Sequence, residues 1–103
     1  MLELRPNCEL CDRDLPPTSA EARICSYECT YCADCTESLR NVCPTCGGGF
    51  SARPIRPLKA WRPGLNLGRG FHPAGSERHH SRWSADEVRA FTALVAPISP
   101  EER

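Results

Sequence analysis

The residues that decide the fold lie between positions 8 and 46, CELCDRDLPPTSAEARICSYECTYCADCTESLRNVCPTC. This stretch holds all eight cysteines of the 103-residue chain, and every one of them belongs to a close pair. The pairs are Cys8–Cys11, Cys25–Cys29, Cys32–Cys35 and Cys43–Cys46. Paired thiols at this spacing direct two sulfur atoms at one ion, and four of them make a closed tetrahedral site. Eight cysteines therefore predict two four-cysteine sites.

The chemistry expected at these sites depends on the compartment. The N-terminal residues lack a basic segment followed by an apolar one, which predicts a cytoplasmic protein whose thiols stay reduced. Thiolate ligands favour zinc, so we expect two structural Zn²⁺ ions. A disulfide framework, a thiol-redox motif and an iron–sulfur cluster are the competing interpretations. A closed site leaves no position for substrate, and no catalytic constellation accompanies it, so we expect no enzymatic activity and no small-molecule substrate.

Two pairings of the cysteines are open. In the sequential pairing, Cys8, Cys11, Cys25 and Cys29 share one ion, and the other four share the second. In the interleaved pairing, which we favour, the first site is Cys8, Cys11, Cys32 and Cys35, and the second is Cys25, Cys29, Cys43 and Cys46. Interleaving fits a β-hairpin over residues 22–31 and a short helix over 36–40, whose N-terminus favours thiolates. The predicted fold class is a small metal-stabilised α+β module of treble-clef or RING-like type, followed by an irregular tail and a C-terminal helix.

The order of ligands in residues 8–46 resembles a RING-type cross-brace, with Cys29 where that family usually has histidine. Cys43-Pro44-Thr45-Cys46 is similar to the CPxC element that often closes a RING. The resemblance implies two interleaved zinc ions and a protein-binding surface. Leu10 suits the partner-docking position of a RING ligase, but the segment TESLRNV lacks the usual tryptophan, and Gly47 replaces the usual basic residue. Ubiquitin-ligase-type activity, like thiol-redox activity, is thus a minor alternative.

A closer resemblance covers residues 1–49. The segments MLELRPNCELCDRDLPP, EARICSYECTYCADC and CPTCGG are similar to a small bacterial family, domain of unknown function 1272, at ligand and non-ligand positions alike. This resemblance implies a bacterial, cytoplasmic, zinc-binding protein and carries no activity with it.

The formal net charge of zero hides two halves of opposite sign. Residues 1–50 hold four basic and eight acidic side chains, whereas residues 51–83 hold seven basic side chains and one acidic one. The second segment is rich in proline and glycine, which predicts an extended or disordered linker. Ser84 and Glu87 have the spacing of a capping box at the start of an amphipathic helix. The predicted organisation is a double-zinc module at 1–50, a basic linker at 51–83, a helix at 84–96 and a tail at 97–103.

Three roles are open for the basic linker: a solvated spacer, a segment that folds back on the acidic module, and a binding site for an anionic partner. We expect a non-enzymatic interaction or adaptor module whose partner is a protein. The alternative partner is a nucleic acid, bound through the linker's basic residues Arg53, Arg56, Lys59, Arg62 and Arg69. No apolar run reaches the roughly 20 residues of a membrane span, so no membrane partner is expected.

Overall fold

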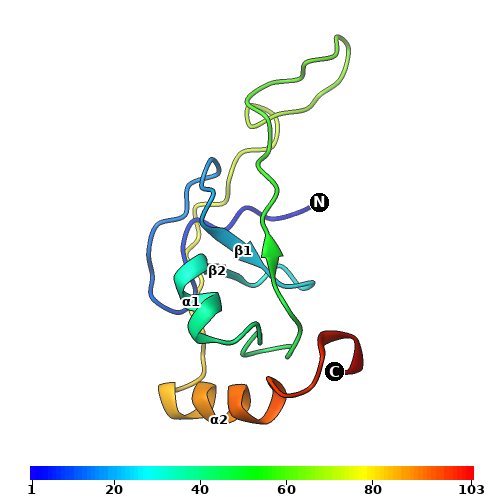
Figure 1. The fold of residues 1–103 in the computed structure, drawn as a ribbon. Helices are drawn as coiled ribbons and strands as arrows, with labels where there is room; N and C mark the ends of the chain where they lie inside the picture. The colour runs from blue at the N-terminus through cyan, green and yellow to red at the C-terminus, as the bar shows by residue number, and fades with distance from the viewer.

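The computed structural model describes residues 1–103 as a small α+β fold around a three-stranded antiparallel sheet (Figure 1). The strands lie in the order β2-β1-β3, and α2 lies at one end of the molecule. The elements are β1 (Ala22–Ile24), β2 (Thr30–Cys32), α1 (Ala33–Ser38), β3 (Ser51–Ala52), α2 (Ala85–Val95) and a short 3₁₀ helix, η1 (Pro100–Glu102). The α+β class predicted from the sequence is confirmed at this level.

The β1–β2 hairpin brings distant cysteines together. Ala22 pairs with Cys32 at one end of the ladder, and Ile24 pairs with Thr30 at the other. Beyond the ladder, the Cys25 amide donates to the Cys29 carbonyl at 3.1 Å, and Glu28 takes a left-handed φ of 69° to close the turn. The hairpin therefore sets two cysteines at its turn and a third at the far end of β2.

Helix α1 follows β2 directly, with Cys32 as its N-cap residue. It ends after about two turns because Arg40 and Asn41 both adopt left-handed backbone conformations, with φ of 52° and 60°. The Asn41 side chain then accepts a hydrogen bond from the Phe50 amide at 2.8 Å. This contact closes the loop that carries Cys43 and Cys46.

The core is small and rich in thiols. Its most buried side chains include Leu4, Leu15, Tyr31 and Val42, and four of the eight cysteines are buried among them. Tyr31 meets Phe50 edge to face, with ring centroids 5.3 Å apart. Such a core excludes little apolar surface from water, so the cysteines occupy positions that aliphatic side chains fill in larger domains.

Helix α2 packs across the loop between Cys43 and Gly47. Its Ser84 side chain accepts from the Glu87 amide while the Glu87 carboxylate accepts from the Ser84 amide, which is a complete capping box. Val88 joins the core, Trp83 packs beside it, and the Trp83 indole donates to the Thr45 hydroxyl at 3.3 Å. The apolar side of α2 is thus docked on the cysteine-bearing half of the chain.

Replacing Ser84 with alanine is expected to destabilise the docked helix by about 1 kcal/mol, because the Glu87 amide loses its acceptor at the helix start. Chemical unfolding of metal-saturated protein in a Trp61→Phe background, where Trp83 is the one remaining tryptophan, measures the change by fluorescence. Ser76→Ala is the matched control, since Ser76 is exposed and lies outside any helix. Equal stability of the two variants would contradict the prediction.

The segment that the sequence predicts to be a linker is largely without regular secondary structure, but it begins with β3, which pairs with β1. Beyond β3 the chain runs out into a projecting loop and then returns along the module to α2 (Figure 1). The radius of gyration is 15.0 Å, against about 13 Å for a compact chain of this length, so the molecule is elongated. No helix is long and apolar enough to cross a membrane.

Candidate metal centres

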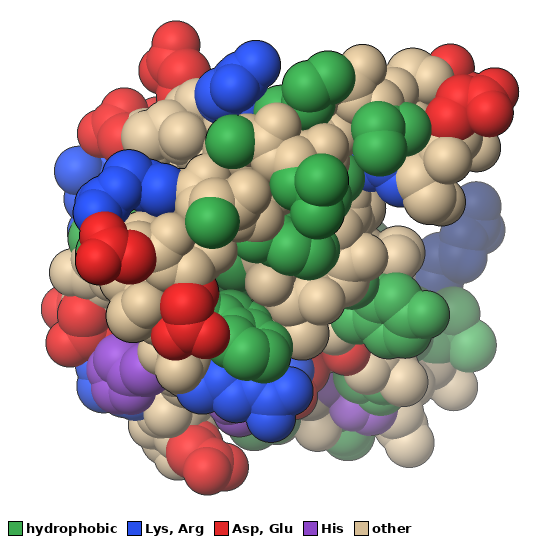
Figure 2. All heavy atoms as spheres, turned by 90° about the horizontal axis from the view of Figure 1, so that it is seen from below, with side chains coloured by type: hydrophobic (Ala, Val, Ile, Leu, Met, Phe, Trp, Pro, Cys, Tyr) green, Lys and Arg blue, Asp and Glu red, His purple; other side chains and the backbone are tan.

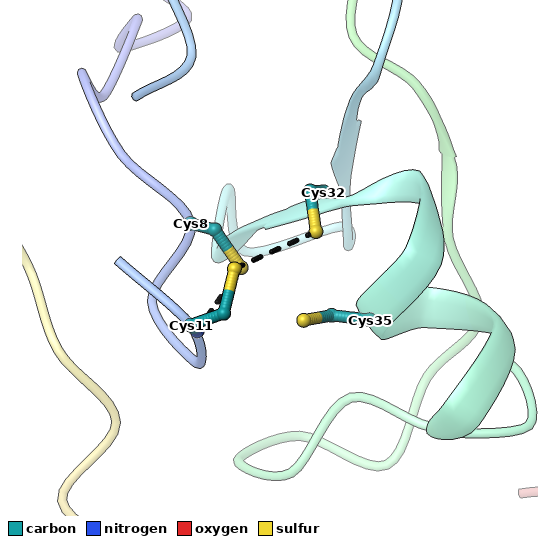
Figure 3. Close-up of side chains that lie close together, drawn as sticks. All are labelled: Cys8, Cys11, Cys32 and Cys35. Carbon is teal, nitrogen blue, oxygen red and sulfur yellow. Dashed lines mark hydrogen bonds between the residues drawn. The ribbon is translucent and has the colours of Figure 1, made fainter. Parts of the chain in front are cut away.

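The first cluster contains Cys8, Cys11, Cys32 and Cys35, whose sulfur atoms all lie within 4.8 Å of one another. Figure 3 shows the four side chains converging, two from the loop before β1 and two from the junction of β2 with α1. The sulfurs of Cys11 and Cys32 are 3.7 Å apart, well beyond the S–S bond length of about 2.05 Å, so the thiols are free. Cys8 and Cys32 are buried and Cys11 is exposed.

The second cluster contains Cys25, Cys43 and Cys46, whose sulfur atoms also lie within 4.8 Å of one another. Cys29, the fourth predicted ligand, is outside that group, although its side chain packs against the core cluster that includes Cys25 and Cys43. The structure therefore brings together all four residues of the first predicted set and three of the second, and leaves Cys29 outside the second group. Both groups draw on segments that are far apart in the chain.

The loops at Cys8–Cys11 and Cys43–Cys46 have the same backbone hydrogen bonds. The Cys8 amide donates to the carbonyl of Arg13, five residues ahead, at 2.8 Å. The Cys43 amide donates to the carbonyl of Gly48, also five residues ahead, at 2.8 Å. Each first cysteine also accepts at its carbonyl from the amide four residues ahead, at 2.9 Å in both loops. That fourth residue is left-handed in both, Asp12 with φ of 66° and Gly47 with φ of 79°. One loop geometry thus presents two sulfurs in each cluster.

Backbone amides point at several sulfurs. The Cys11 amide donates to the Cys8 sulfur at 3.5 Å, the Tyr27 amide to Cys25 at 3.3 Å, and the Gly48 amide to Cys46 at 3.3 Å. Such bonds stabilise negative charge on sulfur, so they favour the thiolate form that metal binding requires.

Neighbouring thiols shift one another's acidity. Hydrogen bonds from Cys29 and Cys43 lower the pKa of Cys25, whereas the bond with Cys25 raises the pKa of Cys29 to about 11. Burial raises the pKa of Cys46 to about 12, and the bonds with Cys25 and Cys29 raise that of Cys43 further. One thiolate per cluster is readily held by its neighbours, but four together need a cation to balance their charge.

The donor sets fit a divalent metal ion. With metal–sulfur distances of about 2.3 Å, the corners of a sulfur tetrahedron lie about 3.8 Å apart, close to the 3.7 Å between Cys11 and Cys32. Both clusters contain sulfur alone, which suits soft or borderline metals rather than magnesium or calcium. The two clusters could therefore each hold a metal ion.

Residues 1–56 match the family model described as "Protein of unknown function (DUF1272)". The chain belongs to this family. An uncharacterized protein of Rhizobium meliloti (strain 1021) is 62% identical over 58 residues, which span 55% of this chain and 69% of that protein. The family resemblance inferred from the sequence is confirmed, and the relative is bacterial. No solved structure matches the chain.

A buried arginine lies three residues before the end of the DUF1272 match and joins that end to the rest of the module. Arg53 is 4% exposed, and its guanidinium donates to the carbonyls of Arg5, Leu15 and Pro16 at 2.8 to 3.1 Å. Burial lowers its pKa from the usual value. The module thus extends past residue 50. The spacing of the cysteines could not predict this contact, because Arg53 binds backbone oxygens, which every residue carries.

Replacing Arg53 with alanine is expected to lower the free energy of unfolding by about 3 kcal/mol, since three carbonyls lose a charged donor in a buried setting. Urea unfolding at saturating zinc measures the loss. Arg62→Ala is the control, because that exposed side chain changes stability by less than about 0.5 kcal/mol. A loss at Arg53 no larger than the control's would refute the assigned role.

Residues 75–81, here called the strap, lie along the first cysteine loop of the DUF1272 module. The buried Asn7 side chain donates to the His79 carbonyl at 2.7 Å and accepts from the His79 amide at 3.0 Å. Arg78 forms ion pairs with Asp12 at 3.0 Å and Asp14 at 2.7 Å. Two backbone bonds flank these contacts, from Gly75 to Leu4 and from Ser81 to Glu9. The strap thus places basic side chains on the acidic module.

The five basic residues predicted to face a nucleic acid lie in different surroundings. Arg53 is buried as described, Arg56 donates to the carbonyls of Leu2 and His72, and Arg69 donates to the carbonyl of Arg56. Lys59 and Arg62 are exposed, and the Lys59 ammonium stands 4.5 Å from the centre of the Trp61 ring. The freely presented charges are therefore in the projecting loop.

Proposed function

We propose that this DUF1272 protein is a zinc-stabilised, non-enzymatic interaction module of the cytoplasm. Its two interleaved sites are Cys8, Cys11, Cys32 and Cys35, and Cys25, Cys29, Cys43 and Cys46. The hairpin, short helix and paired loops then form a treble-clef, RING-like cross-brace.

The observation that carries the proposal is the convergence of Cys8, Cys11, Cys32 and Cys35 within 4.8 Å, from two segments some twenty residues apart. Burial raises the pKa of Cys32 and of Cys35 there, so without a cation these two side chains stay neutral thiols. A bound dication stabilises the thiolate form of all four cysteines. Apparent binding energies of structural zinc reach about 10–16 kcal/mol per site. Zinc is the metal that best suits a closed tetrahedron of sulfurs.

The absence of an enzymatic role follows from the ligand set. Four protein thiolates saturate a tetrahedral zinc, so neither water nor substrate gains a coordination position. What zinc supplies here is a fixed arrangement of the four segments that carry the cysteines.

The face around α2 is the one we assign to a protein partner. Figure 2 views the molecule from the α2 end, where hydrophobic side chains gather across the middle of the surface. A shallow groove runs between Pro44 and Thr45 on one side and Trp83, Phe91 and Leu94 on the other. Leu94 is 70% exposed, which is unusual for a leucine on a helix already docked by its other side.

Metal analysis of protein purified under reducing conditions tests the metal assignment. We expect two zinc ions per chain and cysteines that resist alkylation until a chelator is added. Fewer than one zinc per chain, or visible absorption from an iron–sulfur cluster, would reject it.

The partner face is tested by comparing Leu94→Asp with Leu67→Asp, an exposed leucine in the projecting loop. A protein that binds the wild-type chain through this face is expected to be lost with the first variant and kept with the second. Loss with both variants, or with neither, would place the contact elsewhere.

A further inference from the structure

Residues 57–69 form a closed loop that stands away from the cysteine module. The Arg69 amide donates to the Pro57 carbonyl at 2.9 Å, which joins the two ends of the loop. In Figure 1 this loop projects at the end of the molecule opposite α2, beyond both termini. The family match ends before the loop begins, so it is an addition to the DUF1272 module.

The neck of the loop is built for close approach of two backbones. Gly68 has φ of 94°, and a Cβ there would lie 2.6 Å from the Lys59 Cα, so only glycine fits. The amides of Phe71 and His72 both donate to the Gly68 carbonyl. The loop is therefore held at its base by defined contacts.

The loop and its neck present apolar and basic side chains together. The exposed apolar residues of this region are Ile55, Leu58, Trp61, Leu65, Leu67 and Phe71, and Trp61 is 76% exposed. Four basic residues lie among them, and residues 54–76 contain no acidic one. In water this arrangement leaves large apolar side chains hydrated with no neighbour to cover them.

We propose that this loop docks the protein on the surface of an anionic phospholipid bilayer. Trp61, Leu65 and Leu67 enter the headgroup region, where indole and aliphatic side chains are stable. Lys59 and Arg62 lie beside them and meet the lipid phosphates. Surface docking needs no spanning helix, so it is compatible with the lack of an apolar segment of that length.

The choice of a bilayer over a nucleic acid rests on the kind of apolar side chain that the loop exposes. A single-stranded nucleic acid stacks its bases on aromatic rings and gains little from leucine. Between residues 57 and 69, three of the four large exposed apolar residues are leucines, and Trp61 already carries Lys59 over its ring. Aliphatic side chains gain most from leaving water for the acyl-chain boundary.

Sedimentation of the full-length, zinc-loaded chain with vesicles tests the proposal. We expect binding to phosphatidylcholine vesicles that contain phosphatidylglycerol, and none to phosphatidylcholine alone. Lys59→Gln and Arg62→Gln each weaken binding by about fivefold. The double variant Leu65→Ser, Leu67→Ser weakens it by tenfold or more. Brominated lipids quench the fluorescence of the wild-type protein, and the Trp61→Phe variant loses that quenching.

Ile98→Ser is the control, since it removes an apolar side chain that is 42% exposed, against 48% for Leu65 and 47% for Leu67, and lies just beyond α2 at the opposite end; it is expected to bind normally. Zinc content and thermal midpoint confirm that each variant is folded. Failure to bind anionic vesicles, or binding that the Leu65, Leu67 pair does not affect, would overturn the proposal. Salt-sensitive binding to a single-stranded oligonucleotide that survives loss of both leucines would assign the loop to nucleic acid instead.

Discussion

Stripping zinc from the chain with a strong chelator is expected to unfold the DUF1272 module cooperatively. The reason is the composition of the core, where buried cysteines stand in place of aliphatic side chains around a few residues such as Leu4 and Leu15. Whole domains are stable by about 5–15 kcal/mol, and each of the two proposed zinc sites would contribute a comparable amount. When both ions are removed, the remaining core is too small to offset the conformational entropy that the chain loses on folding.

Far-UV circular dichroism and the dispersion of amide proton signals report this unfolding. Zinc added back under reducing conditions restores both signals, whereas magnesium does not, because it prefers oxygen ligands. A reduced, metal-free chain that keeps its dispersed spectrum would show that the side-chain core suffices.

Two double variants, each of which removes two thiols, are expected to differ by one bound zinc ion per chain. Cys11→Ser with Cys32→Ser damages only one site in the interleaved arrangement, so one zinc per chain remains. Cys11→Ser with Cys25→Ser damages both sites, so none remains. Native mass spectrometry of the purified variants counts the bound ions.

The sequential arrangement reverses these outcomes, because Cys11 and Cys25 then share an ion. A measurement without mutations gives an independent answer. In cadmium-substituted protein, NMR couplings to the cysteine β protons assign each residue to one of two cadmium signals. Coupling of Cys11 and Cys25 to the same cadmium would contradict the interleaved pairing.

Local sequence patterns predict the parts of this structure that depend on short-range contacts. The hairpin, the helix after Cys32 and the capping box at Ser84 each arise from residues within a few positions of one another. The cysteine spacing indicates which thiols pair locally, since a loop of two residues allows few geometries. The convergence of Cys8 and Cys11 with Cys32 and Cys35 then follows from the hairpin between them.

The contacts that the sequence does not reveal are made to backbone atoms. Arg53 resembles one more basic residue of a linker, yet its partners are carbonyls of two distant segments, one at Arg5 and the other at Leu15 and Pro16. The Asn7–His79 pair is likewise specified by hydrogen-bonding groups 72 positions apart, without any periodicity. Proline and glycine correctly indicate a lack of helix in residues 54–83, but they carry no information about whether such a segment lies on the module.

Because the strap binds the module independently of the projecting loop, the two parts of the chain on either side of that loop can stay together when the loop is cut. Both flanks of the projecting loop are anchored to the module, one by Arg53 and Arg56 and the other by the strap and α2. A protease that cuts after Lys59 severs the chain without breaking any of those anchors. The two fragments are expected to remain associated, so the loop is a point where the polypeptide can be opened, lengthened or given new termini while the cysteine-bearing body stays intact.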